Sequence, residues 1–489
     1  MKKCLILVLI LTGFGLTARS QQGMILEQAM AIAEENSPSI KRVRLSLIRN
    51  QENLNAQRAS LKSNFSLSIN PFEYTHNREF NDLFAEYFTR ETMSSNGAFT
   101  VTQPIVATDA RISLSNKFQW QDSYSEFSDT RTKGFTNNLS LNIIQPIFTY
   151  NRTKLQIKEL ELALENSQLN YAIQMLSLER TVAQYFYGVY QQQQSLIIAE
   201  EAYENMKKSY DIINNKVDAG LSAREELFQA ELNLATSRSD VENKQVSLEN
   251  AKDDFKLLIG MSLFDDIVVI PDISVDTIEV DIAFAIDNGL ANRMELRQRE
   301  IDIETSQFDL IQTMALNEFK GDVNLSVGIF GDNESFTNIY ESPTDNQQVS
   351  LALTIPLWDW GEKKSRIKAS EASIESQQIN FEEEQNDIII NIRKVFRNLI
   401  NLKNQIGIAE QNVVNAQLTY ELNLEKYENG DLTGMDLAIY QNQLSEKQLS
   451  HTNSLISYKL ELLNLKIQTL YDFENGKPVT PITTLENYN

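Results

Sequence analysis

The chain contains the same structural unit twice, 210 positions apart. Residues 216–220 (KVDAG) return as 426–430 (KYENG), and Pro146 returns as Pro356; 426 − 216 and 356 − 146 are both 210. A repeat of this period decides the architecture before any local pattern is considered. Each copy predicts a strand end, a helix of about 65 residues, a glycine turn and a second helix of about 40 residues. A helix of that length spans about 100 Å and does not fit a compact globule.

The N-terminus predicts a secretory signal peptide over residues 1–20. A basic start precedes an apolar run from 5 to 16, and residues 18–20 offer small side chains for cleavage. A membrane anchor is the alternative, but the run is shorter than the roughly 20 residues of a spanning helix. Cys4 is the only cysteine. The mature chain, expected to begin at Gln21, would therefore have no disulfide, thiolate nucleophile or cysteine-based metal site.

The balance of charge and the motifs exclude several classes of function. The chain carries a net charge of −23, and removing the three basic residues of the signal gives 41 − 67 = −26. Such a chain repels nucleic acid and anionic lipid headgroups, and it suits a lumen that admits cations. The two histidines, His76 and His451, have no partner at metal-ligand spacing. No nucleophile motif or phosphate loop is present, so we expect neither an enzyme nor a cofactor.

Several segments alternate apolar and polar residues, as strands do with lipid on one face and water on the other. The four clearest are 65–70, 139–143, 322–331 and 348–357. The alternative is a set of half-buried strands in a soluble sandwich. Two further segments, 98–105 and 111–120, are separated by a short turn and make the count either four or six. We expect four, with the additional pair as a hairpin outside the main sheet.

These patterns predict a definite order of parts. The signal peptide (1–20) precedes a first repeat at 21–260, a linking segment at 261–290, a second repeat at 291–471 and a C-terminal tail at 472–489. The first repeat should contain helices over 24–62, strands within 64–147, a long helix over 150–215 and a helix over 221–260. The second should contain strands at 322–331 and 347–357, a long helix over 361–429 and a helix over 433–470. The linking segment is acidic and strand-like, and with the tail it should form a small side domain.

This order, with the turn sequences "KVDAGLSAREELFQAELNLA" and "KYENGDLTGMDLAIYQNQL" at matching repeat positions, resembles the TolC family of outer-membrane efflux ducts. The resemblance covers essentially the whole mature chain. It implies a mainly α homotrimer, with an α-helical barrel and a membrane β-barrel of 12 strands, or 18 if the additional pair joins. It also implies a location in the outer membrane of a Gram-negative bacterium, with a long periplasmic extension. The implied function is passive conduction from an inner-membrane transporter and a periplasmic adaptor, in efflux or type I secretion.

The resemblance also implies site residues. Asp436, six places after the second turn glycine, matches an acid that lines the narrow periplasmic mouth. Ile439 stands where the family has a second acidic ring, so this chain would have one ring. Tyr427 and Glu226 match a hydrogen-bonded pair of the closed state. Leu432 replaces an arginine of the family's latch, so a different closing contact is implied. For Asp436 the alternative is a helix N-terminal acid that favours the helix dipole.

The two helical turns are the expected docking sites for the adaptor. Glycine is needed where the chain reverses with positive φ, and the leucines that follow would supply apolar contacts. The alternative is that the glycines serve the turns alone. The expected docking residues are Gly220, Leu221, Ser222, Gly430, Leu432 and Thr433. A different function for the whole chain, a secreted trimeric coiled-coil adhesin or spacer, would explain the helices but not the duplicated strands.

Overall fold

The computed structural model describes residues 22–275 and 278–481. The expected signal peptide (1–20) and the end of the tail (482–489) lie outside the described residues. The chain divides into two compact units. The first comprises the described parts of Met1–Arg44, Tyr171–Arg293 and Asn386–Asn489, and the second comprises Leu45–Asn170 and Met294–Gln385.

Eight α-helices account for most of the described chain, and they repeat in order. They are α1 (Leu26–Asn36), α2 (Pro38–Ser60), α3 (Arg152–Asp218), α4 (Arg224–Ile259), α5 (Ile282–Asn292), α6 (Met294–Met314), α7 (Glu362–Asn429) and α8 (Gly434–Thr469). Helices α5 and α6 begin 256 residues after α1 and α2 (282 − 26 and 294 − 38). Helices α7 and α8 begin 210 residues after α3 and α4 (362 − 152 and 434 − 224). The first repeat therefore contains 256 − 210 = 46 more residues between its helix pairs.

The long helices follow from uninterrupted sequence. Helices α3 and α7 have 67 and 68 residues, and proline, the strongest helix breaker, is absent from both. Helix α2 begins at Pro38, where the missing N–H costs no helical hydrogen bond. Among the described residues, none of the helices combines the length and apolar character that crossing a bilayer requires.

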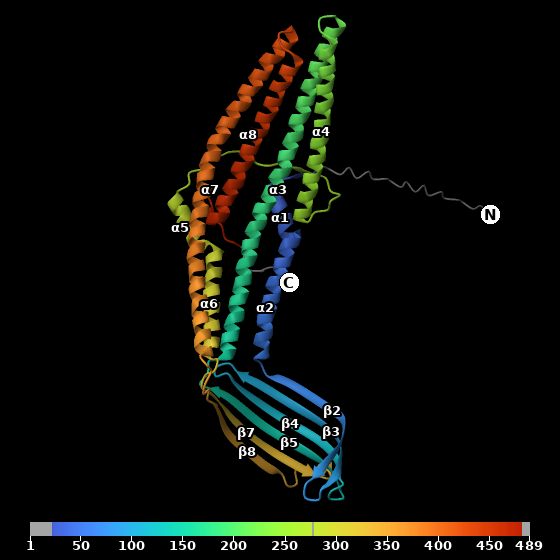
Figure 1. The fold of residues 1–489 in the computed structure, drawn as a ribbon, viewed down its shortest axis with the longest axis vertical. Coiled ribbons are helices and arrows are strands. Elements are labelled where there is room, and N and C mark those ends of the chain that lie inside the picture. Colours follow the sequence, from blue (N-terminus) through green and yellow to red (C-terminus); the bar gives the residue numbers. More distant parts are fainter. Residues whose placement is uncertain (1–21, 276–277, 482–489) are drawn as a thin grey trace, which may run out of the picture. The chain divides into compact units, whose positions relative to one another are not determined.

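The second unit contains one six-stranded antiparallel sheet (Figure 1). Its strands, in spatial order, are β2 (Asn64–Asn81), β3 (Glu86–Ile105), β4 (Ala110–Ser125), β5 (Thr130–Ile147), β7 (Lys320–Asn333) and β8 (Thr344–Thr354). A 3₁₀ turn at Phe336–Asn338 lies between the last two. The prediction of a hairpin outside the sheet was wrong: β3 pairs with β2, and β4 pairs with β5, over most of their lengths. This hairpin supplies most of the additional residues of the first repeat.

One face of the sheet carries a continuous row of apolar side chains. Leu114 lies opposite Val101 on one side and Leu141 on the other, and Leu141 lies opposite Val327. Residues in register share a face, so the row runs across four strands. Leu114, Leu141 and Val327 are 43%, 41% and 52% exposed, so this part of the face is open.

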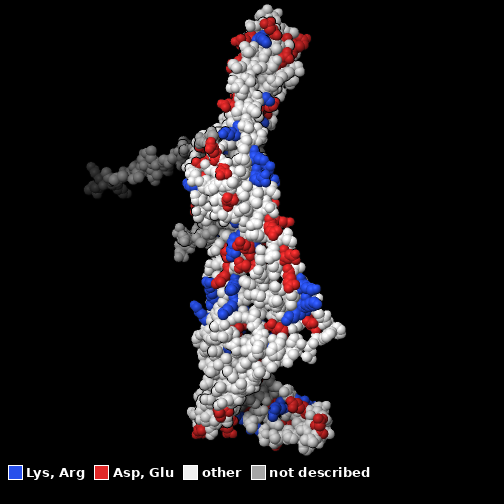
Figure 2. Space-filling model, turned by 90° about the vertical axis from the view of Figure 1, so that its left-hand side faces the viewer, with Lys and Arg blue, Asp and Glu red and all other residues white. Residues whose placement is uncertain are grey.

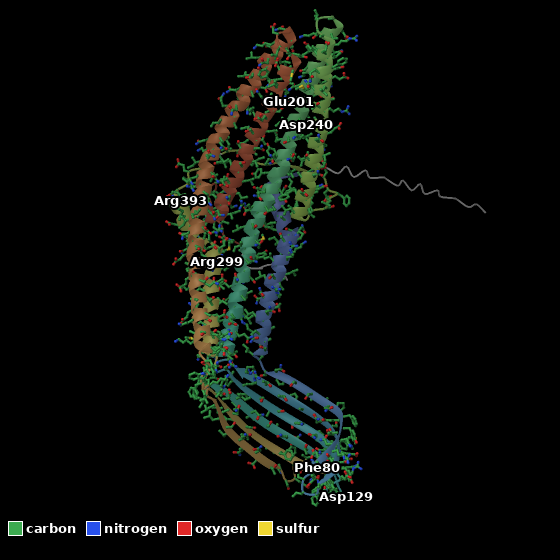
Figure 3. All side chains as sticks on the ribbon, viewed as in Figure 1. Phe80, Asp129, Glu201, Asp240, Arg299 and Arg393 are labelled. Carbon is green, nitrogen blue, oxygen red and sulfur yellow. The ribbon has the colours of Figure 1, made fainter. Side chains whose placement is uncertain are left out.

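The hairpins β2–β3 and β4–β5 continue far beyond this row and are joined at their ends. Phe84, Phe88 and Phe127 form a triad with ring centroids 5.0–6.4 Å apart. The amide of Glu126 donates to the carbonyl of Thr89 at 2.9 Å. Figure 3 marks the two hairpin ends with Phe80 and Asp129.

The first unit also contains a small parallel sheet of β1 (Gln22–Met24) and β6 (Ile267–Val269). The linking segment expected at 261–290 contains the strand β6, but α5 begins within it at Ile282. The prediction of a strand-like linker is therefore correct for its first part only. A short pair, β9 (Tyr471–Asp472) and β10 (Lys477–Pro478), follows α8. Gly260 ends α4 with φ 72°, and a Cβ there would lie 2.6 Å from the carbonyl oxygen of Asn36, so glycine is required.

Candidate site at the helical turns

Two equivalent turns reverse the chain in the first unit, between α3 and α4 and between α7 and α8. Gly220 and Gly430 have φ values of 73° and 89°, a left-handed conformation that favours glycine. Leu221 N donates to the carbonyl of Lys216 at 2.8 Å, and Asp431 N donates to that of Lys426 at 2.9 Å. These bonds complete the Schellman arrangement that satisfies the last carbonyls of a helix. The glycines therefore have a sufficient structural role at both turns.

The expected acids hold polar contacts within their own turns. The hydroxyl of Ser222 donates to Glu226 at 2.6 Å. Thr433 caps α8: its hydroxyl donates to the Asp436 carboxylate at 2.7 Å and accepts from the Asp436 amide at 3.2 Å. Asp436 is exposed and lies in the first turn of α8, where a negative charge is favourable. Its carboxylate thus supports the Thr433 cap while remaining exposed.

Tyr427 does not make the expected hydrogen bond to Glu226. Its side chain is buried, 2% exposed, and its hydroxyl donates to the carbonyl of Ser209 at 3.1 Å. A phenol has one proton to donate, and Glu226 is already bonded to Ser222. Burial, together with the nearby charge of Glu226, raises the pKa of Tyr427 to about 12. Tyr427 therefore stays neutral and ties α7 to α3.

Lys216 makes the contact that joins the two turns. Its ammonium group donates to the carbonyl of Tyr427 at 2.6 Å and lies 5.2 Å from the centroid of the same ring. The carbonyl is near the C-terminus of α7, where the helix dipole favours a cation, and the ring adds a cation–π attraction. Lys216 therefore links the C-terminal ends of α3 and α7.

The turns enclose a small cavity between them, and their leucines differ. Leu221 is 79% exposed, as docking would need. Leu432 is half-buried and packs against a buried cluster that includes Ile213, Tyr427 and Leu437, so the two leucines expected to dock the adaptor differ in exposure. Ile439 is 47% exposed. The cavity is lined by Ile213, Lys216, Leu221, Ser222, Glu226, Tyr427, Gly430, Asp431, Leu432, Thr433 and Asp436.

Acidic side chains outnumber basic ones around the turns, and Figure 2 shows them at the top of the view. The exposed acidic residues there are Asp218, Glu225, Glu226, Glu428, Asp431 and Asp436. Further along, α3 and α8 are linked by polar contacts: Glu201, labelled in Figure 3, accepts from Gln448 at 3.3 Å.

Sequence reasoning missed Lys216 and Ser209. In the repeat, Lys216 is equivalent to Lys426. The hydrogen bond, however, joins Lys216 to Tyr427, the residue that follows Lys426. The available signal was the lysine before each turn, since a cation near a helix C-terminus is favourable. Among the described residues, no group of three or more His, Cys, Asp or Glu side chains could hold a metal ion.

A profile of the family described as "Outer membrane efflux protein" matches residues 110–261 and 285–466. The cation efflux system protein CusC of Escherichia coli (strain K12) is 20% identical over 281 residues, which cover 56% of this chain and 59% of that protein. The chain thus matches somewhat over half the length of this curated relative.

Solved structures share the fold. The Campylobacter jejuni CmeC outer membrane channel superposes with a TM-score of 0.70 at 14% identity, covering 94% of this chain and 87% of the other. The open state of the Neisseria gonorrhoeae MtrE outer membrane channel superposes with a TM-score of 0.64 at 13% identity, covering 91% and 88%. The resemblance to the TolC-like fold is confirmed, and with the profile match over more than half its length the chain belongs to the outer membrane efflux protein family.

Proposed function

We propose that this protein is the outer-membrane exit duct of a tripartite efflux or type I secretion system. It conducts substrates passively from a periplasmic adaptor and an inner-membrane transporter to the exterior. The observation that carries the proposal is the six-stranded sheet with an exposed apolar face, in a chain of the outer membrane efflux family. Selectivity in such a duct comes from its width and its rings of charge, and no covalent chemistry is needed.

Three of the strands contain a long segment without charged residues, as membrane-crossing segments do. Residues 94–105 of β3, 134–147 of β5 and 323–331 of β7 contain no Asp, Glu, Lys or Arg. Their lengths meet the roughly 9–11 residues that a tilted strand needs to cross a bilayer. Charged residues return beyond this band on the long hairpins, as in Arg90 and Glu91. Segments of this kind are costly to expose to water, and lipid would cover the apolar row.

Three copies would assemble by closing the sheet. Strands β2 and β8 each have one unpaired edge, and three six-stranded sheets joined edge to edge give 3 × 6 = 18 strands. Open edges in lipid leave backbone groups unsatisfied. The helices offer matching contacts, because Phe228 and Leu232 on α4 and Leu418 and Leu422 on α7 form exposed apolar pairs four residues apart. A trimer would bury these pairs.

The turns are the proposed mouth and docking sites. A threefold ring of Asp436 at a narrow opening would favour cations, which fits the acidic surroundings and the name of the cation efflux relative. The exposed Leu221 would contact the adaptor. A secreted coiled-coil adhesin, the alternative function, does not account for the apolar sheet.

A two-part experiment tests the proposal. Protein purified in detergent should migrate as a trimer that heating dissociates, and it should form ion-conducting channels in planar bilayers. A variant with Leu418 and Leu422 both changed to Asp should remain monomeric. Matched changes at the exposed positions Lys207 and Lys208 should leave the trimer intact. A monomer that is soluble without detergent and forms no channels would rule out the duct.

A further inference from the structure

Both repeats carry the same pair of lysines in the second unit. Lys154 and Lys158 of α3 recur as Lys364 and Lys368 of α7, since 364 − 154 = 368 − 158 = 210. They are the third and seventh residues of helices that begin at Arg152 and Glu362. A spacing of four places the members of a pair on the same side of the helix, one turn apart. All four are exposed.

Lys154 and Lys364 lie in the first turn of their helices, and each has a second lysine four residues further on, an unfavourable arrangement of charge within the chain itself. Positive charge near a helix N-terminus opposes the helix dipole, and like charges four residues apart repel. Among the described residues no carboxylate pairs with any of the four ammonium groups. Arg366, two positions from both Lys364 and Lys368, is paired with Glu362 at 2.8 Å. The repetition of an unfavourable pair points to negative charge supplied from outside the chain.

Exposed aromatic residues precede each lysine pair. Phe148 and Trp358 are also 210 positions apart and are 62% and 75% exposed. Phe148 contacts Phe319 with ring centroids 5.2 Å apart, and Trp358 contacts Trp360, itself 90% exposed, at 5.6 Å. Aromatic rings in such positions are typical of the boundary between bilayer and water.

The order along the chain therefore matches a membrane surface. The uncharged segments 134–147 and 346–358 end at these aromatic residues. Each lysine pair lies six and ten residues beyond its aromatic residue, within two helical turns of the helix start. Figure 2 shows this arrangement on one face of the second unit: Lys and Arg gather on the helices beside the sheet, and a band without charges follows.

We propose that Lys154, Lys158, Lys364 and Lys368 bind the phosphate groups of anionic phospholipids in the membrane leaflet on the helical side of the sheet. This rests on the membrane location in the proposed function. Each ammonium group has three donors for phosphate oxygens, and basic clusters beside a membrane segment recognise anionic lipid. The net charge of −23 predicted repulsion of such lipid, but the local charge at this boundary has the opposite sign.

The tryptophans provide a direct probe. The chain has three, Trp120, Trp358 and Trp360, so a Trp120→Phe background leaves only those beside Lys364 and Lys368. This protein would be placed in phosphatidylcholine vesicles containing either brominated phosphatidylglycerol or brominated phosphatidylcholine. Bromine quenches fluorescence only at close contact. We expect phosphatidylglycerol to be preferred about fivefold, the effect of about one lysine near an anionic surface, and the preference should fall with added salt.

The variant K154Q/K158Q/K364Q/K368Q should lose the preference, giving equal quenching by both lipids. If the fourfold change impairs folding, the double variants K154Q/K158Q and K364Q/K368Q can be used instead. K364Q/K368Q should lose more of the lipid preference, because the remaining tryptophans lie beside these two lysines. A matched control is K207Q/K208Q/R393Q/K394Q, which removes four exposed basic residues of the first unit and should retain the preference.

Four results would overturn the proposal. Equal quenching of the starting protein by both lipids would show that the lysines do not select anionic lipid. A preference retained in the fourfold variant would assign it to other residues. Lysine-dependent sedimentation with cell-wall sacculi, without lipid preference, would mean that the partner is peptidoglycan. Quenching by neither lipid would reject the membrane location of this boundary as well, which distinguishes failure of the proposed function from failure of the lysine sites alone.

Discussion

The ammonium group of Lys216 lies 2.6 Å from the carbonyl oxygen of Tyr427, a residue of the other repeat. Together with the bond from the Tyr427 hydroxyl to the carbonyl of Ser209, this contact fixes the end of α7 to α3. Both bonds end on backbone carbonyls, so they depend on the relative position of the helices and not on a second flexible side chain. Separation of the two turns would break both.

Replacing Lys216 with Met should loosen the turns and increase opening of the channel. Charge-assisted hydrogen bonds contribute about 1.5–3 kcal/mol, and for a half-buried lysine we expect the lower end. This corresponds to a roughly tenfold rise in the ratio of open to closed channels, measured as open probability in planar bilayers. Lys208→Met, an exposed position on the same helix, is the control. Equal effects of the two changes would contradict a role for the Lys216 contact.

Replacing Tyr427 with Phe should change the response of the protein to alkaline pH. Its pKa is raised from 10.0 to about 12 by burial, so the folded state holds the phenol proton more tightly than the unfolded chain does. The resulting stabilisation is complete below pH 10 and is lost as pH rises through about 12. The free energy of unfolding of Tyr427→Phe should therefore fall less over this interval, measured by urea unfolding followed by circular dichroism.

At neutral pH, the free energy of unfolding of Tyr427→Phe should be about 1 kcal/mol lower than that of the unchanged protein, because the hydrogen bond to the carbonyl of Ser209 is removed. A pH profile parallel to that of the unchanged protein would show that Tyr427 ionises freely in the folded state. In that case burial at this position would have to be incomplete in the assembled protein.

Replacing Asp436 with Asn should weaken the preference for cations. A unit charge at about 4 Å is worth about 1 kcal/mol in water, so loss of a threefold ring should lower the cation-to-anion permeability ratio roughly fivefold. Asn retains an oxygen that can accept from Thr433, which preserves the cap. Asp240→Asn, exposed on α4, is the control for net charge. Reversal potentials in planar bilayers measure the permeability ratio of both variants. A preference for anions in the unchanged protein would refute the acidic mouth.

Replacing Leu221 with Asp should prevent docking of the adaptor and leave the trimer intact, because Leu221 is 79% exposed. Leu221→Ala should weaken docking less. Leu432→Asp should instead destabilise the turn, since Leu432 packs on the buried cluster around Tyr427 and Leu437. Cross-linking to the adaptor in cells and trimer migration in gels separate the two effects. Normal cross-linking of Leu221→Asp would move the docking surface elsewhere.

The sequence predicted the helices well, because the spacing of apolar residues and the absence of proline act between residues close together in the chain. The long helix expected over 361–429 is α7 (Glu362–Asn429), and no glycine or proline near its centre competes except Gly407. Local patterns could not predict the difference in exposure between the two leucines that follow the turn glycines. Leu221 and Leu432 both follow a turn, and only the position of the neighbouring helices makes one exposed and the other half-buried.

The sheet shows the same limit. Alternation identified the segments 98–105 and 111–120 as strands, but pairing is a contact between distant segments, and alternation does not reveal it. The structure pairs β3 with β2 and β4 with β5, which is why the hairpin belongs to the sheet. The contact of Lys216 with Tyr427 was missed for a related reason, since it joins positions that the repeat does not align.

The last prediction tests whether the inserted hairpin contacts lipid. Leu114 of β4 lies in the apolar row opposite Val101 and Leu141, and Ser113 points to the opposite face because side chains alternate along a strand. Cys4, the only cysteine, lies in the expected signal peptide. Leu114→Cys should therefore react with a lipid-phase maleimide, and Ser113→Cys should react with a water-soluble reagent that enters the channel.

Phe118→Cys, on the same face as Leu114 and four residues along β4, should follow the lipid-phase pattern. Thr132→Cys, on the long β4–β5 hairpin beyond the uncharged band, is the control and should react with water-soluble reagent from outside the cell. If Leu114→Cys and Phe118→Cys react only with water-soluble reagents, β3 and β4 do not border the bilayer. The membrane-crossing part would then contain four strands of each chain, and the eighteen-stranded assembly would be wrong.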